Sequence, residues 1–269
     1  MSDMTAHDIL FRRIILGLHR GAPESAAIRT AAQLAELLRL EFFGLFAEDP
    51  SVLGLAAMPF GRELRSLERE WRPITAAALT EEMDVAARGA QRMFAETAAA
   101  LHVAAEFQLV KGSIAETIEA AMRIGDIVVV PAPASPMERI TQQFSHLLET
   151  AFRCAGAVLL VPGDIARQTG AIVAVAAGPD DPGARLARVI AAAANEKMIL
   201  VEVAGDARRF QEVSSRLGRG SERLLVLARD LYDEALVPAM ACARRVPVLV
   251  VDSGKRDGSD VATAGRRAS

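Results

Sequence analysis

The run DIVVV, from Asp126 to Val130, opens the stretch that decides the fold. A helical pattern follows from about Met137 to Cys154, and a second β-branched run, AVLLV, closes the stretch from Ala157 to Val161. Short β-branched runs that alternate with longer helical patterns are typical of a parallel sheet covered by helices. The sequence therefore predicts an α/β protein with parallel strands.

The same alternation continues from this stretch toward the N-terminus. The strands and helices expected there are, in chain order, a strand Arg13–Leu18, a helix Glu24–Leu38, a strand Glu41–Ala47, a helix Leu79–Leu101, a strand Ala105–Val110 and a helix Ile114–Met122. The first half of the chain is therefore expected to contribute five strands to a sheet.

Beyond a linker at Pro162–Gly170, rich in turn residues, the pattern restarts. The elements expected there are a strand Ala171–Ala176, a helix Gly183–Asn195, a strand Met198–Val203, a helix Ala207–Leu217, a strand Leu224–Ala228, a helix Leu231–Ala243 and a strand Pro247–Val251. This pattern indicates an internal duplication with a shortened second copy. We expect one domain at 10–163, a second at 170–252 and a disordered tail at 253–269.

Composition and charge exclude several classes of protein. The chain is 51% apolar and 24% charged, which is typical of a globular protein. A net charge of −3 and only 4% aromatic residues argue against a surface that binds nucleic acid. The N-terminus lacks the apolar core of a signal peptide, and runs such as Ala171–Ala177 are far shorter than the ~18 residues that span a bilayer. We expect a soluble, cytoplasmic protein.

These features resemble a tandem member of the universal stress protein family. The first strand and turn, from Ile14 to Ser25, are similar to the opening of that family, and the spacing from Asp126 to Val161 matches its closing strand–loop–helix–strand order. The run from Pro247 to Val251 resembles its last strand. The resemblance covers about residues 10–252 and implies a Rossmann-like sheet of the adenine nucleotide α-hydrolase type in each half.

The resemblance also implies where a nucleotide would bind. In the nucleotide-binding members an Asp ends the first strand, and a glycine-rich loop ending in Gly-Ser or Gly-Thr follows the fourth. On this chain the Asp position falls on His19, and the three glycine positions fall on Pro131, Ala134 and Phe144, whereas Ser145 keeps its expected type. The residues implied for this degenerate site are His19, Arg20, Gly21, Val130, Pro131, Ala134 and Ser145.

Each departure from that pattern opposes phosphate binding. Pro131 removes a backbone donor, Ala134 adds a Cβ, and the Phe144 ring would stand where phosphates would otherwise lie. In the second half, Ala176 falls on the Asp position, and the loop that would hold phosphate is missing. We therefore expect no cofactor, with ATP or AMP held by altered contacts near His19 and Ser145 as the alternative.

Other motifs give no support for an enzyme or a metal site. The chain has no Walker loop, no Gly-x-Gly-x-x-Gly fingerprint and no Gly-x-Ser-x-Gly elbow. Its four histidines and its two cysteines, Cys154 and Cys242, form no metal-ligand spacing. Ser145 and His146 are adjacent, but neighbouring helical residues do not face each other. We expect no catalytic residues.

An apolar stretch at Pro50–Phe60 stands where a polar loop would be usual, and a mixed-charge segment from Arg62 to Trp71, predicted as helical, follows it. This region is either packed over the sheet edge or forms an exposed patch that docks a partner subunit or a target protein.

Three functions are compatible with the sequence. They are a regulatory protein that has lost nucleotide chemistry and acts through protein contacts, a sensor of ATP or AMP, and an enzyme of the wider hydrolase-like class. We favour the first, with an unknown protein partner and a homodimer formed through Pro50–Trp71. The resemblance further implies that the closing strands Ala157–Val161 and Pro247–Val251 lie antiparallel side by side, which hides both edges.

Overall fold

The structure is a computed structural model. It describes residues 11–19, 25–54, 62–65, 70–73, 75–123, 125–203, 222–229 and 233–252. The predicted helix Ala207–Leu217, the tail 253–269 and most of the apolar stretch Pro50–Phe60 lie outside the described residues.

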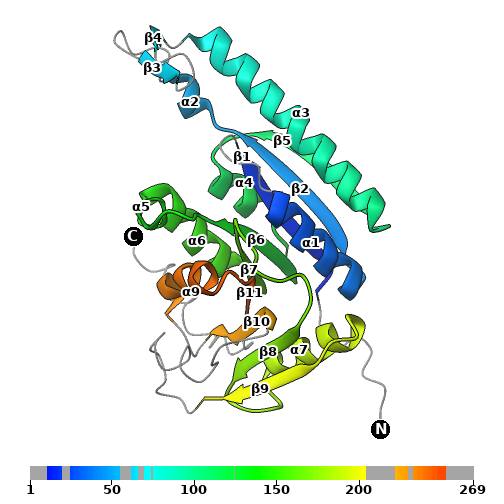
Figure 1. The fold of residues 1–269 in the computed structure, drawn as a ribbon. Coiled ribbons are helices and arrows are strands. Elements are labelled where there is room, and N and C mark those ends of the chain that lie inside the picture. The colour runs from blue at the N-terminus through cyan, green and yellow to red at the C-terminus, as the bar shows by residue number, and fades with distance from the viewer. Residues whose placement is uncertain are drawn as a thin grey trace, which may run out of the picture.

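The β-branched runs form one nine-stranded sheet with the order β5-β2-β1-β6-β7-β11-β10-β8-β9 (Figure 1). Its strands are β1 Arg13–His19, β2 Glu41–Glu48, β5 Ala105–Lys111, β6 Asp126–Ala132, β7 Ala157–Pro162, β8 Ala171–Ala176, β9 Met198–Glu202, β10 Glu222–Ala228 and β11 Val248–Val251. All neighbouring strands are parallel except β7 and β11. The protein is therefore α/β with a mostly parallel sheet, as expected.

The antiparallel pair β7–β11 joins the two halves of the sheet. Leu159 lies opposite Leu249 and Val158 opposite Val250, and these side chains are at most 2% exposed. The predicted side-by-side arrangement of the closing strands is confirmed. One continuous hydrophobic core therefore runs across the junction on each face of the sheet.

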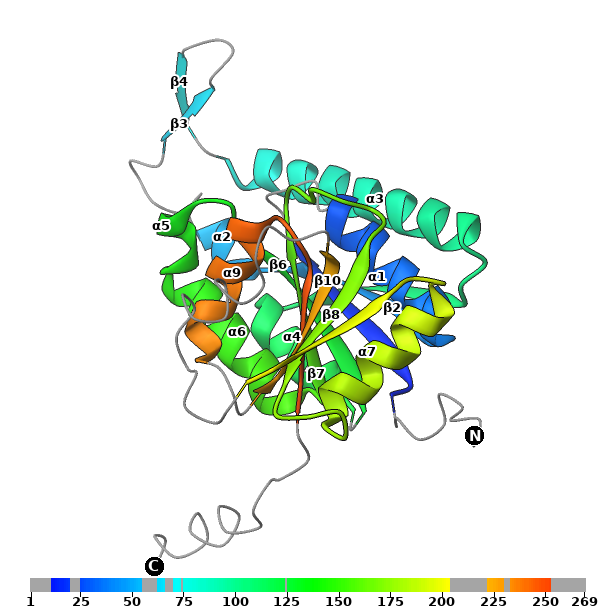
Figure 2. The same ribbon diagram turned by 60° about the horizontal axis from the view of Figure 1, so that its bottom comes forward.

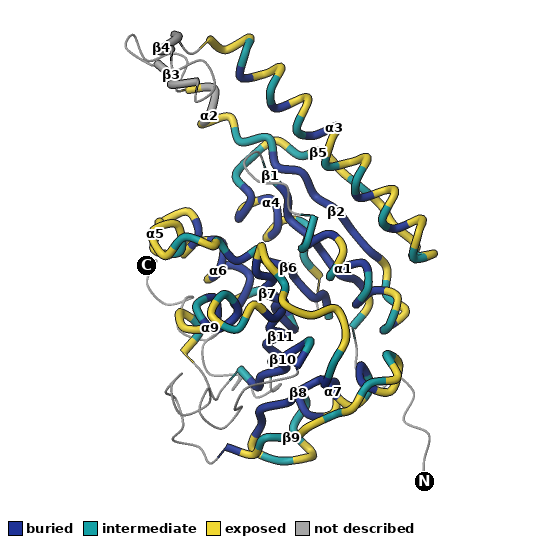
Figure 3. Tube along the Cα trace, viewed as in Figure 1, coloured by how far each residue is buried: buried dark blue, intermediate teal, exposed yellow. Residues whose placement is uncertain are grey.

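Helices cover both faces of the sheet (Figure 2). One face carries α1 Ser25–Leu38, α3 Ala76–Ala100 and α7 Pro182–Ala193, and the other carries α4 Ile114–Ala121, α6 Gln142–Cys154 and α9 Val237–Arg244. Each helix turns an apolar stripe inward. The central strands are consequently buried, whereas the outer helix faces and the two edge strands are largely accessible (Figure 3).

A buried ion pair ties the amino ends of β1 and β6 together. The Asp126 carboxylate accepts from Arg13 Nη2 at 2.6 Å and from Arg13 Nε at 3.1 Å, and it also accepts from the backbone N–H of Arg123. Arg13 Nη2 also donates to the carbonyl oxygen of Ala121. Both charges are therefore hydrogen-bonded, as buried charges must be.

Two predicted helices have the wrong bounds. The helix expected over Met137–Cys154 is split into α5 Pro136–Arg139 and α6, because the Thr141 hydroxyl caps a new helix by accepting from Phe144 N. The helix expected at Leu231–Ala243 is preceded by a 3₁₀ turn, η4 Glu234–Leu236, and α9 begins only at Val237 with Pro238 in its first turn.

The segment predicted as helical at Arg62–Trp71 contains a two-stranded hairpin instead. Its strands are β3 Arg62–Arg65 and β4 Glu70–Pro73, and they follow the short helix α2 Pro50–Gly54. Alternating charges suit the i, i+4 pairs of a helix and the cross-strand pairs of a hairpin equally well, so the charge pattern could not decide between them.

Candidate functional site

The carboxyl ends of β1 and β6 lie at the topological switch point of this sheet, which we call the ligand edge. From these two adjacent strands the chain continues in opposite directions, through β2 on one side and β7 on the other. Ligands of open α/β sheets bind at such a switch point. The structure brings His19, at the end of β1, and Pro131, near the end of β6, to this edge.

The other residues implied for a nucleotide site are not all available there. Val130 is fully buried between strands, whereas Ala134 is exposed in the turn after β6. Ser145 is exposed in the first turns of α6. The remaining two, Arg20 and Gly21, lie outside the described residues.

The turn after β6 is held by its carbonyl oxygens. Arg139 Nη1 donates to the oxygen of Pro133 at 2.8 Å and to that of Ala134 at 2.9 Å. The Cys242 thiol, on α9, lies 3.4 Å from the Pro133 oxygen and 4.0 Å from that of Ala132. Two elements from opposite halves of the chain therefore fasten this turn.

This arrangement is the reverse of a phosphate cradle. A cradle directs backbone N–H groups toward an anion, whereas here neighbouring carbonyl oxygens converge on the Arg139 guanidinium. Sequence reasoning missed the contacts that Arg139 and Cys242 make with this turn. No local spacing marks either contact, because Cys242 is more than one hundred residues from the turn that it meets.

The position of Phe144 corrects one expectation. Its side chain is 7% exposed and belongs to the core beneath α6, together with Leu147, Leu148 and Ala151. The ring therefore packs inward from the first turn of the helix, and the expectation that it stands in the space of a phosphate is wrong.

A groove of about 620 Å³ lies between α5 and α6 on one side and η4 and α9 on the other. Arg139, Phe144 and Ser145 line it from the first half of the chain, and Asp233 and Pro238 line it from the second. Ile140 lines the groove and is 72% exposed. Two further large apolar residues lie beside it, Met137 on α5, which is 71% exposed, and Leu236 on η4, which is 37% exposed. The groove is therefore bordered by unusually accessible apolar surface.

Among the described residues of the second half of the chain, the carboxyl ends of β8 and β10 and the N-terminus of α7 leave no comparable site for an anion. The Asp181 carboxylate caps α7 by accepting from Gly183 N at 2.8 Å, so an acidic side chain already occupies this helix N-terminus. Gly183 packs against the end of β10, because a Cβ built on it would be in van der Waals contact with the backbone nitrogen of Ala228 at 3.5 Å. Ala176, on the Asp position of the family pattern, is fully buried.

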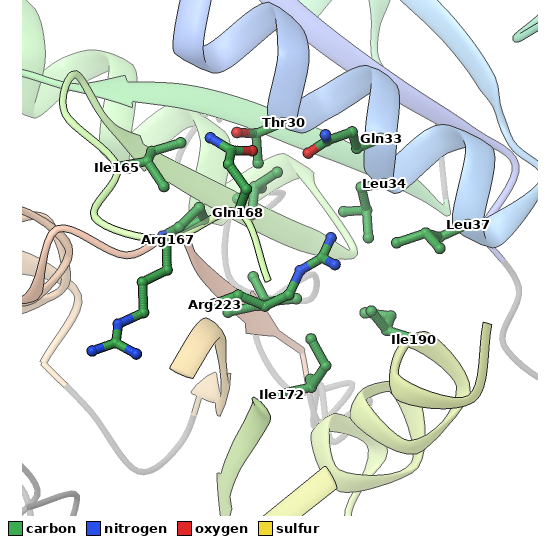
Figure 4. Close-up of a pocket in the computed structure, with 13 residues that line it drawn as sticks. Thr30, Gln33, Leu34, Leu37, Ile165, Arg167, Gln168, Ile172, Ile190 and Arg223 are labelled. Carbon is green, nitrogen blue, oxygen red and sulfur yellow. The ribbon is translucent and has the colours of Figure 1, made fainter. Parts of the chain in front are cut away.

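A narrow slot lies where α1 meets α7 across the junction of the two halves (Figure 4). Thr30 and Leu34 face Ile172 and Ile190 across it, and the Arg223 side chain extends between them. Its volume of about 40 Å³ is enough for a few water molecules. A nucleotide would not fit there.

Among the described residues, no group of three or more His, Cys, Asp or Glu side chains could hold a metal ion. Within the same part of the chain, no helix is both long enough and apolar enough to cross a bilayer.

The Cys242 thiol gives a test of the turn contact. Burial raises the pKa of Cys242, and the nearby Arg139 charge only partly offsets this effect. In a Cys154→Ser variant, DTNB should therefore modify Cys242 more slowly in the native protein than in urea, and the rate for the native protein should rise at higher pH.

The same raised pKa affects stability. Because the thiol of the unfolded chain ionises at a lower pH than that of the native protein, the free energy of unfolding should also fall as the pH rises through the thiol range. Equal native and unfolded rates at every pH would contradict the contact.

Comparisons with known proteins support the fold alone. No family model and no curated protein matches the chain. Among solved structures, the crystal structure of the functionally unknown protein PA1789 from Pseudomonas aeruginosa PAO1 is similar, with a TM-score of 0.51. The alignment covers 92% of this chain and 95% of that chain at 15% sequence identity. The likeness therefore extends over both halves of the sheet.

Proposed function

We propose that this chain is a non-enzymatic regulatory protein, similar to universal stress proteins, that has lost adenine nucleotide binding and acts through contacts with another protein. The proposal depends on two surfaces. One is the turn after β6, at the carboxyl ends of the strands, and the other is the neighbouring groove between α6 and α9.

The observation that carries the proposal is the pair of hydrogen bonds from Arg139 to the oxygens of Pro133 and Ala134. They fix the turn with its carbonyl oxygens directed at a cation that the chain itself supplies. Pro131, just before it, has no N–H to offer. An incoming phosphate would have to displace Arg139 from two short hydrogen bonds and would then meet oxygens rather than donors.

The groove supplies the surface for a protein contact. Met137 and Ile140, three residues apart in sequence, are each more than 70% exposed, and neighbouring exposed apolar side chains are typical of a protein contact surface. Glu138 and Glu149 are exposed on α5 and α6, and Glu149 lines the groove. The partner that fits this surface presents an apolar segment with basic residues beside it.

One observation favours the alternative, a sensor of ATP or AMP. Arg139 and Ser145 line the same groove, so a phosphate could approach from the groove side and meet a guanidinium and a hydroxyl together. His19 would then lie toward the base, at the end of β1.

Native mass spectrometry of the purified full chain distinguishes the two functions. We expect the mass of the polypeptide alone, with no adenine nucleotide bound, both as purified and after incubation with ATP or AMP. A stable mass increase equal to one nucleotide would support the sensor. Ser145→Ala is then the informative variant, because only the sensor needs that hydroxyl, and its matched control is the neighbouring His146→Ala.

A further inference from the structure

Strand β5 ends the sheet with a free backbone edge. It pairs with β2 along all seven residues, from Ala105 to Lys111, without a shift in register. Among the described residues, no strand pairs with its other side. A straight, regular edge of this length can accept a further strand.

The outward groups of this edge can be assigned. Phe42 N donates to Ala104 O, and Gly112 N donates to Glu48 O, so the even-numbered residues of this segment face β2. In a parallel pair both backbone groups of a residue point to the same side, and the side alternates along the strand. The N–H and C=O groups of Ala105, Phe107, Leu109 and Lys111 therefore point away from the sheet.

Within the part of the chain that the structure describes, this edge has few of the devices that usually block such pairing. Natural edges are protected by proline, by bulges, by several lysines or by a covering element. β5 contains no proline and no bulge, and its only lysine is Lys111, at its last position. Leu109, near the middle, is 48% exposed.

We propose that β5 is a self-association site, at which a second copy of this chain adds its own β5 antiparallel across a two-fold axis through Gln108. In this register Phe107 of one copy pairs with Leu109 of the other, and both residues direct their backbone groups outward. Ala105 pairs with Lys111 in the same way. The two Gln108 residues face each other at the axis, at a non-hydrogen-bonded position, where Cα atoms lie about 4.5 Å apart.

The side chains of β5 are complementary to themselves in this register. Glu106 lies opposite Val110 and Lys111 opposite Ala105, so no like charges oppose each other. Phe107 and Leu109 pair on one face, which covers the exposed Leu109 side chain, and the Gln108 amide, which now donates to Glu106 at 2.6 Å, can donate across the axis. An axis through Glu106 would instead oppose two carboxylates, and only the axis through Gln108 pairs all seven residues.

This interface is independent of the proposed function, because it lies at an edge of the sheet, whereas the groove lies between helices that pack on the central strands, and because it involves no nucleotide. It also differs from the homodimer through Pro50–Trp71 that the sequence suggests.

A cysteine at the axis tests the register. In a Cys154→Ser/Cys242→Ser background, Gln108→Cys should form an intermolecular disulfide under mild oxidation, because facing Cα atoms at this distance suit a disulfide. Non-reducing gels should show a species of twice the chain mass that reducing agent removes. The matched control is Ile199→Cys on β9, the opposite edge strand, where residue 199 is 38% exposed. Cross-linking of the control instead of Gln108→Cys would overturn the proposal.

A proline at the edge tests the pairing without a cysteine. Leu109 N–H points away from β2, so Leu109→Pro removes no hydrogen bond of the single chain. Light scattering should give a dimer for the unaltered protein and a mass halved for Leu109→Pro, with an unchanged far-UV circular dichroism spectrum. Met137→Lys, which removes an apolar side chain elsewhere that is even more exposed (71% against 48% for Leu109), should remain a dimer. A monomeric unaltered protein, or a Leu109→Pro variant that is still a dimer, would overturn the proposal.

Discussion

Replacing Asp126 with alanine should lower the free energy of unfolding by about 3–5 kcal/mol, because it leaves the Arg13 guanidinium buried without a counter-charge. Asp126 is 1% exposed and Arg13 8% exposed, and three hydrogen bonds end on this carboxylate. In the native protein the hydrogen bond to Asp126 raises the pKa of Arg13, and the variant loses this support. The guanidinium nevertheless stays charged, because arginine is too basic to lose its proton inside a protein. Urea denaturation followed by circular dichroism measures the effect.

Two controls separate burial from charge in this experiment. The double variant Arg13→Met/Asp126→Leu removes both charges and should recover most of the loss. The exposed pair formed by Arg153 and Glu119, at 2.9 Å, should give no measurable change when Glu119 is replaced with glutamine. If Asp126→Ala were as mild as Glu119→Gln, the Arg13–Asp126 contact would not tie β1 to β6 as described.

Shortening the facing leucines of the β7–β11 pair should have an effect of the same order. Leu159→Ala and Leu249→Ala should each lower the free energy of unfolding by about 2–5 kcal/mol, because both side chains are fully buried and each substitution leaves a cavity. Since the two residues are direct cross-strand neighbours, the double variant should depart from additivity by about 0.5–3 kcal/mol. Each variant should still unfold in one transition, because the two halves share a core on each face.

The exposed Val85→Ala, at a position that is 58% exposed on α3, is the control and should leave the denaturation midpoint unchanged. Additive losses at Leu159 and Leu249, or two separate transitions in which only one responds to each substitution, would mean that the halves fold independently of the β7–β11 pair.

Most of the sheet could be predicted from sequence because its strands are buried on both faces. The strand Asp126–Ala132 contains the continuous β-branched run Ile127–Val130, and such runs leave little choice of structure. The junction of the two halves was predicted from the resemblance of the closing strands to one another and to a known family. The helix ends were less predictable, because they depend on single capping contacts such as that of Thr141.

The candidate site was predictable only in part. On the pattern that the sequence resembles, Pro131 and Ala134 fall on glycine positions and predict the loss of a phosphate loop, but they do not show how the turn after β6 is held. The turn is held by Arg139, in a helix of only four residues, and by Cys242, which comes from the other half of the chain. The inward direction of Phe144 was equally hidden, because it depends on where α6 begins.

The most direct test of the account is calorimetric titration of the full chain with ATP and with AMP. Because the turn after β6 directs its oxygens at Arg139, we predict no binding heat beyond dilution for either nucleotide. Arg139→Ala should not create binding, because the turn would still lack Pro131 N–H and the glycines of a cradle. Saturable binding of ATP or AMP by the unaltered chain, weakened by Ser145→Ala but not by His146→Ala, would contradict the account.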